Sequence, residues 1–327
     1  MHLLTGDAGS AGDLFTVTPA YAHGKKSLLR SLRPSCYAET LVDTADATYV
    51  FGDGTMPIGA DVVAVFGSNY RTATLQLNTS DSWGSPAQTV SMDATLYAST
   101  VSASVSGLVA LTGAAMIPHR YRSTPNRKYY LQLKANNQEI YEILDNDESR
   151  VYVTGLGTGY TGEAAWIFGD RMGARFVSSS RMYARLLIAA QDTASETFQT
   201  GTVWLGKAHT IEPLYDNGFV DSWEPNVSEW TTDAGIRQGA RRGGETHKLR
   251  IAWGAIDRLT YDYVERVTRL FRGLDGTVEP VLFWRNPDDV STLGLYTIDG
   301  PPGSENSYGE LATAFERIPQ IILSEYR

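Results

Sequence analysis

The middle of the chain, from about residue 57 to residue 205, alternates short apolar runs with polar turn sequences. In YYLQLKA, Tyr130 and Gln132 fall on one side of an extended chain, whereas Leu131 and Leu133 fall on the other, as a half-buried strand requires. Gly, Asn, Asp and Pro interrupt the runs at GSNYR, NTSDSWGS, STPNRK, NNQ, DNDES and GLGTG. The pattern predicts strands at Val62–Phe66, Thr72–Asn78, Thr89–Tyr97, Ser106–Thr112, Tyr129–Lys134, Ile140–Leu144, Arg150–Thr154, Ala165–Phe168, Met182–Ala189 and Thr202–Leu205. Many short strands at this spacing favour a β-sandwich or jelly roll.

The pattern of turn residues also predicts a domain boundary near residue 212. Residues 212–228, EPLYDNGFVDSWEPNVS, hold two prolines and an Asn-Gly turn. We expect a β-sandwich domain over residues 1–212, with a loop-rich entry over 1–50, and a smaller sheet domain over 213–327. A length of 327 residues fits two domains.

The second domain is predicted to be a sheet with one covering helix over residues 256–272. The helix is indicated by an apolar stripe with a period of 3.6 residues and by Gly273, a natural helix stop. The stripe consists of Ile256, Leu259, Tyr263, Val264, Val267, Leu270 and Phe271. The predicted strands are Phe219–Trp223, Val227–Thr231, Thr246–Trp253, Val278–Trp284, Leu293–Ile298 and Ile318–Ser324.

Residues 233–245 are rich in glycine and arginine, which predicts an exposed and mobile loop. The basic residues in and just after it stand out in a chain of net charge -9. Two interpretations stay open: docking on an acidic face of another subunit, or a solvated loop. The candidate subunit-interface residues are Arg237, Arg241, Arg242, Lys248 and Arg250.

Composition and charge exclude several classes of protein. An acidic chain is not expected to coat nucleic acid or to bind it sequence-specifically. The single cysteine, Cys36, gives no disulfide framework or thiolate metal cluster and is interpreted as a small buried hydrophobe. The start of the chain shows no secretory signal, and the apolar runs are too short for a membrane span. We therefore expect a protein made in a cytoplasm, with no membrane insertion.

Short motifs that resemble ligand sites are each better explained as turns or strands. Gly157–Gly162 matches G-x-G-x-x-G but is not followed by a helix-like segment, and Gly201–Lys207 lacks the hydroxyl residue of a phosphate loop. Asp145–Glu148 resembles the start of a calcium loop without its later ligands, and the five histidines are scattered. We predict no cofactor, no metal and no catalytic residue. A sandwich-fold glycosidase stays open, because its two carboxylates need not be close in sequence.

The order of these segments resembles tailed-bacteriophage distal tail and baseplate (minor tail) proteins. The C-terminal part, with DAGIRQGARR, ETHKLRIAWGAID and VEPVLFWRNPDD, resembles their ring-forming domain. The middle part, with DVVAVFGSN, ATLQL, YYLQL and TVWLGKAHTIEP, resembles the galactose-binding-like jelly roll of phage minor tail proteins. The resemblance covers roughly residues 55–327, although the family usually places the ring domain first.

This resemblance implies a structural protein of the virion tail tip. Such proteins form six-fold or three-fold rings that join the tail tube to the hub or to receptor-binding fibres, so the expected partners are copies of itself and other tail proteins. The jelly roll implies a host surface glycan as a further candidate partner. Trp83, Tyr70 and Tyr160 are the aromatic candidates by residue type only. The alternatives are a carbohydrate-binding adhesin and a glycan-active enzyme.

Overall fold

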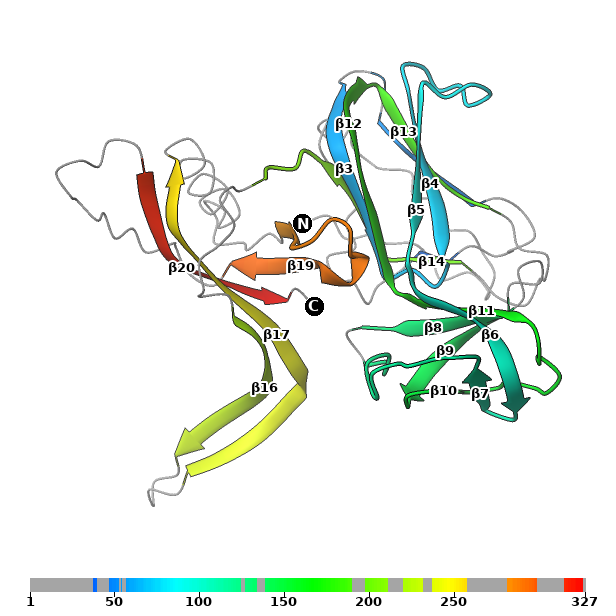
Figure 1. Ribbon diagram of the computed structural model, residues 1–327. Helices are drawn as coiled ribbons and strands as arrows, with labels where there is room; N and C mark the ends of the chain where they lie inside the picture. The colour runs from blue at the N-terminus through cyan, green and yellow to red at the C-terminus, as the bar shows by residue number, and fades with distance from the viewer. Residues whose placement is uncertain are drawn as a thin grey trace, which may run out of the picture. The chain divides into compact units, whose positions relative to one another are not determined.

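The computed structural model describes residues 38–39, 47–52, 54, 57–124, 127–133, 139–189, 198–210, 220–231, 237–257, 281–298 and 315–325 (Figure 1). The chain divides into two compact units: Met1–Ala208 with Asn286–Ser291, and His209–Arg285 with Thr292–Arg327. Within the described residues, the structure consists of antiparallel strands and one short 3-10 helix, η1 (Val290–Thr292). The predicted mainly-β class is confirmed.

The first unit contains a sandwich of two antiparallel sheets. One sheet has the order β2-β13-β4-β5 and the other the order β12-β3-β15. Its strands are β2 (Ala47–Phe51), β3 (Ile58–Phe66), β4 (Thr72–Asn78), β5 (Gln88–Asp93), β12 (Arg171–Arg181), β13 (Tyr183–Ile188) and β15 (Thr202–Gly206). A two-stranded ladder joins β1 (Ala38–Glu39) to β14 (Gln199–Thr200).

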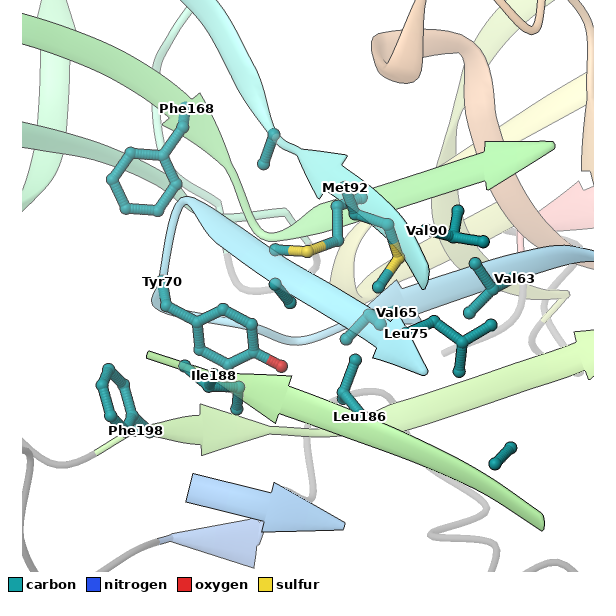
Figure 2. Packing of buried hydrophobic residues seen from close by; sticks show 14 of the residues in the cluster. Val63, Val65, Tyr70, Leu75, Val90, Met92, Phe168, Leu186, Ile188 and Phe198 are labelled. Atoms are coloured by element: carbon teal, nitrogen blue, oxygen red, sulfur yellow. The ribbon is translucent and has the colours of Figure 1, made fainter. Parts of the chain in front are cut away.

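The sandwich encloses one apolar core, which Figure 2 shows from close by. Alternate residues of β4 point into it: Leu75 and Leu77 have no exposed surface, whereas Thr74 and Gln76 are half-buried. Tyr70 is also buried, packs edge-on against Phe198 and is hydrogen-bonded through its hydroxyl to Thr200 Oγ1 at 3.0 Å. The alternation is what a strand with one core-facing side needs.

Between β5 and β12 the chain builds a closed six-stranded barrel with the order β10-β7-β6-β11-β8-β9. The strands are β6 (Thr95–Val105), β7 (Leu108–Leu111), β8 (Tyr129–Leu133), β9 (Glu139–Asn146), β10 (Arg150–Val153) and β11 (Ala164–Gly169). A second core fills it, with Leu131, Leu133, Ile143, Val151 and Ile167 all fully buried. The barrel is therefore an insertion in the sandwich with its own hydrophobic core.

Asp170, on the link from the barrel to β12, ties the barrel to the sandwich. It is 8% exposed, its Oδ2 accepts from the Lys128 backbone N–H at 3.0 Å, and its Oδ1 accepts from Arg171 Nε at 3.3 Å. Its own carbonyl accepts from the Ser68 N–H at 3.0 Å, which brings in the end of β3. Through its carboxylate and its backbone carbonyl, Asp170 thus ties the exit from the barrel to the residue before β8 and to the end of β3.

The second unit is a five-stranded antiparallel sheet with the order β16-β17-β20-β19-β18. Its strands are β16 (Val220–Thr231), β17 (Arg237–Asp257), β18 (Val281–Trp284), β19 (Leu293–Ile298) and β20 (Phe315–Glu325). Apolar residues of β17 and β20 face each other across the ladder: Leu249 opposes Leu323, and Ile251 opposes Ile321. All four are buried.

The structure corrects the prediction of a single sandwich over residues 1–212. The predicted strands from Ser106–Thr112 to Ala165–Phe168 belong to the barrel, and Thr89–Tyr97 is split between β5 and β6. β12 was not predicted, since RMGARFVSSSR lacks a regular alternation and its ladder to β3 is interrupted between Arg175 and Ser179. Closure of the barrel depends on pairing between strands far apart in sequence, which alternation alone does not specify.

Two predictions for the second unit are also corrected. Residues 237–245 are not a loop, because they form the first part of β17. Ile256 and Asp257 are not the start of a helix, because they pair with Glu316 and Phe315 of β20. The rest of the predicted helix, residues 258–272, and the first part of the predicted loop, residues 233–236, lie outside the described residues.

Candidate assembly interface

Strand β17 changes partner along its length. Arg237–Arg250 pairs with β16, whereas Lys248–Asp257 pairs with β20 on the other edge. Only Lys248, Leu249 and Arg250 are paired in both ladders. The sheet is therefore strongly staggered.

The stagger leaves a two-stranded ribbon, formed by Glu224–Thr231 of β16 and Arg237–Thr246 of β17. In Figure 1 the two strands of this ribbon run side by side past the end of β20. Among the described residues, no strand pairs with the outer edge of β16 or with the second edge of Arg237–Thr246. A bare edge offers backbone N–H and C=O groups to another strand, and a lone two-stranded ribbon is marginally stable in water.

The ribbon has an irregularity near its middle. Pro225 opposes Glu245 and Val227 opposes Arg241, so Asn226 on one strand faces Arg242, Gly243 and Gly244 on the other. Proline in a strand is compatible with an edge position, because it has no N–H to donate to a ladder. The regular ladder beyond this bulge joins Val227–Thr231 to Arg237–Arg241.

The five candidate interface residues are all on β17 but fall in two groups. Arg237, Arg241 and Arg242 belong to the ribbon. Lys248 and Arg250 lie in the short stretch that has a strand on each side. The structure thus places the first three, and not the last two, beside an edge that no described strand pairs with.

A polar cluster lies at the base of the ribbon, where β20 ends. His247 Nε2 is 2.6 Å from Asp221 Oδ1, and His247 Nδ1 is 3.3 Å from the Tyr296 hydroxyl. Arg285 Nη1 lies 3.5 Å from the other oxygen of Asp221. In the neutral Nε2–H tautomer, the ring donates to the carboxylate and accepts from the tyrosine. This cluster joins β16, β17, β19 and the end of β18.

The position of Tyr296 in this cluster depends on Gly294. A Cβ atom at Gly294 would come within 2.5 Å of the Tyr296 ring. Tyr296 is buried, with 2% of the residue exposed. Its ring packs edge-on against the ring of Phe283, with 6.2 Å between the ring centres. No signal in the sequence indicated the cluster, because its members are 26 and 49 positions apart.

The aromatic candidates for glycan contact differ in exposure. Tyr70 is in the sandwich core and Tyr160 is 9% exposed, with its hydroxyl bonded to Glu139 and Tyr141. Trp83 is half-buried, its indole N–H donates to Asp81 Oδ1 at 2.8 Å, and the Arg185 guanidinium lies 4.8 Å from its ring centre. Of the three, Trp83 alone keeps substantial exposed surface.

The motif-like segments lie in strands and turns. Gly157–Gly162 connects β10 to β11, so a strand follows it, and Gly201–Lys207 spans β15. In Asp145–Glu148, Asn146 is buried and holds the neighbouring turn, accepting from the Tyr121 N–H at 2.8 Å and donating to the Ile117 carbonyl at 2.8 Å. Asp147 Oδ1 accepts from the backbone N–H groups of Ser149 and Arg150. Within the described ranges, no group of three His, Cys, Asp or Glu side chains is arranged to hold a metal ion.

In the part of the chain that the structure describes, no helix has the length and apolar character to cross a bilayer. No family model matches this sequence, and neither the curated proteins nor the solved structures give a match.

Proposed function

We propose that this protein is a structural component of a bacteriophage tail tip or baseplate. In this role it forms a ring or collar that joins the tail tube to the hub or to receptor-binding fibres. The first unit acts as the galactose-binding-like jelly-roll part, with the barrel as an insertion, and the second unit acts as the assembly domain. The proposal rests first on the sequence resemblance over residues 55–327.

One structural observation supports an assembly role: the ribbon of β16 and β17 has two bare backbone edges among the described residues. Such edges are commonly blunted or covered in soluble proteins, because they recruit other strands. A ribbon that extends from its sheet is therefore well suited to meet another subunit. In this proposal the second unit is therefore the part that binds a neighbouring subunit.

The test is the protein content of purified phage particles. Mass spectrometry of particles separated on a density gradient is expected to find this chain, and antibody-gold labelling is expected to mark the end of the tail. Absence of the chain from particles that otherwise infect normally would overturn the proposal. Labelling on the capsid would overturn the tail-tip location.

The half-buried Trp83 beside Arg185 supports an adhesin as the second candidate, because aromatic faces with polar neighbours suit sugar binding. Binding of the purified protein to a glycan array, lost in Trp83→Ala and kept in Tyr152→Phe, would favour that role. Turnover of an oligosaccharide would instead favour the glycan-active enzyme.

A further inference from the structure

The two strands of the ribbon carry opposite charge. β16 contains Asp221, Glu224 and Glu229 and no basic residue. The ribbon part of β17, Arg237–Thr246, contains three arginines and one glutamate. The ribbon therefore has one acidic edge strand and one basic edge strand.

We infer that the basic edge of β17 in one copy pairs with the acidic edge of β16 in a second copy, continuing the sheet from subunit to subunit. This inference rests on the proposed ring and names its contact. Backbone hydrogen bonds supply the attraction common to any added strand, and the opposite charges select which edges meet. Because the two contact surfaces differ, the contact is head-to-tail and closes into a ring if the rotation per subunit permits.

Charge disfavours the two symmetric alternatives. Pairing β17 with β17 would bring two arginine-bearing strands together, and pairing β16 with β16 would bring two acidic strands together. Like charges on adjacent strands destabilise a sheet. Pro225 further limits the outer edge of β16, since it lacks an N–H, so the contact is centred on Val227–Thr231.

The decisive experiment uses a charge-swapped chain, Glu224→Arg, Glu229→Arg, Arg237→Glu and Arg241→Glu. The swap keeps opposite charges within the ribbon, so the ribbon is expected to form. The swapped chain should associate with itself as tightly as the wild type does, because each of its edges has also changed sign. Light scattering after gel filtration measures the mass as multiples of 35.8 kDa, and an affinity tag on one chain tests mixing.

Half-swapped chains sharpen the result. Glu224→Arg with Glu229→Arg makes both strands basic, and Arg237→Glu with Arg241→Glu makes both acidic. Each alone is expected to bind itself about tenfold more weakly or worse, and an equimolar mixture should recover association. Circular dichroism and limited proteolysis report whether each half-swapped chain is folded. If a half-swapped chain does not fold, the fully swapped chain provides the test, and its failure to associate with itself would contradict the pairing.

A folded half-swapped chain that binds itself as tightly as the wild type overturns this pairing, and so does a wild type that stays at 35.8 kDa at every concentration tested. Neither result bears on whether the chain is present in particles, so the tail role can stand while this contact fails. If the chain is absent from particles but the half-swapped chains behave as expected, the contact stands and the proposed role fails.

Discussion

The barrel strand β6 and the ribbon strand β17 both change partners along their length, with opposite consequences. β6 pairs with β11 over Thr95–Thr100 and with β7 over Val101–Val105. At the change of partner, the Val101 N–H donates to the Glu163 carbonyl at 2.8 Å and the Thr112 N–H donates to the Thr100 carbonyl at 2.8 Å. The ladder then continues around a closed barrel.

In β17, by contrast, the change of partner occurs in an open sheet. The β16 ladder continues well beyond the end of the β20 ladder, and the described residues supply no further strand there. The same change of partner therefore closes the barrel in β6, whereas in β17 it leaves part of the described sheet only two strands wide. The barrel therefore has a complete ring of ladders of its own, whereas the ribbon has edges that no described strand pairs with.

The largest effect is expected from Leu131→Ala in the barrel core. Leu131 has no exposed surface, so truncation leaves a cavity and should lower the free energy of unfolding by about 3 kcal/mol. Urea unfolding measures the loss, with Val177→Ala, at a residue 83% exposed, as the control. If the barrel is self-sufficient, association of the second unit should be unchanged. Loss of association in Leu131→Ala would contradict the separation of the two roles.

A smaller effect is expected from Gly294→Ala in the second unit. The added Cβ would meet the Tyr296 ring at 2.5 Å, displacing the hydroxyl from His247, at a cost of about 2 kcal/mol. Hydrogen exchange should rise in β17 and β20 while the barrel strands stay protected. Gly84→Ala is the matched control, because a Cβ added at Gly84 would have open space around it. Equal exchange in the two variants would show that the cluster does not hold the base of the ribbon.

Tyr70→Phe probes the sandwich core. At neutral pH the lost hydrogen bond to Thr200 should cost about 1 kcal/mol. Burial raises the pKa of Tyr70 well above its usual value, an effect that the Thr200 hydrogen bond partly opposes. The neutral hydroxyl therefore stabilises the fold fully below about pH 10 and less as pH rises above that value.

The Phe variant should accordingly lose less stability than the wild type between neutral pH and about pH 11. Urea midpoints at both pH values measure the difference. The same alkaline loss in both proteins would show that Tyr70 is not the group responsible.

The smallest effect is expected from Asp145→Asn on the barrel. Burial raises the pKa of Asp145, but hydrogen bonds from His119 and from the Asn146 N–H, together with nearby positive charge, lower it overall. A lowered pKa means that the contribution is present above about pH 4 and is lost as pH falls through the folded-state value.

The carboxylate is 32% exposed, so its loss should cost about 0.5 kcal/mol at about pH 6 and vanish near pH 3. Urea unfolding of both proteins at the two pH values measures it. A difference that persists at low pH would point to lost packing instead of lost charge.

The sequence predicted individual strands well where alternation was clear. Thr72–Asn78 and Leu293–Ile298 were predicted with the bounds that the structure shows. The interpretation of Arg237–Glu245 as a loop was wrong, because glycine and arginine content indicates solvent exposure but does not exclude a strand paired on one edge. The Asp221–His247–Tyr296 cluster was not predictable, because no local pattern links residues on three strands.

By itself, the sequence determined the β class, most strand positions and the unequal charge of β16 and β17, because these depend on residue type and a period of two. The tertiary structure alone decided that β6 closes a barrel and that β17 leaves a ribbon. That choice depends on which distant strands pair and where each ladder ends, and those long-range contacts leave no local pattern in the chain.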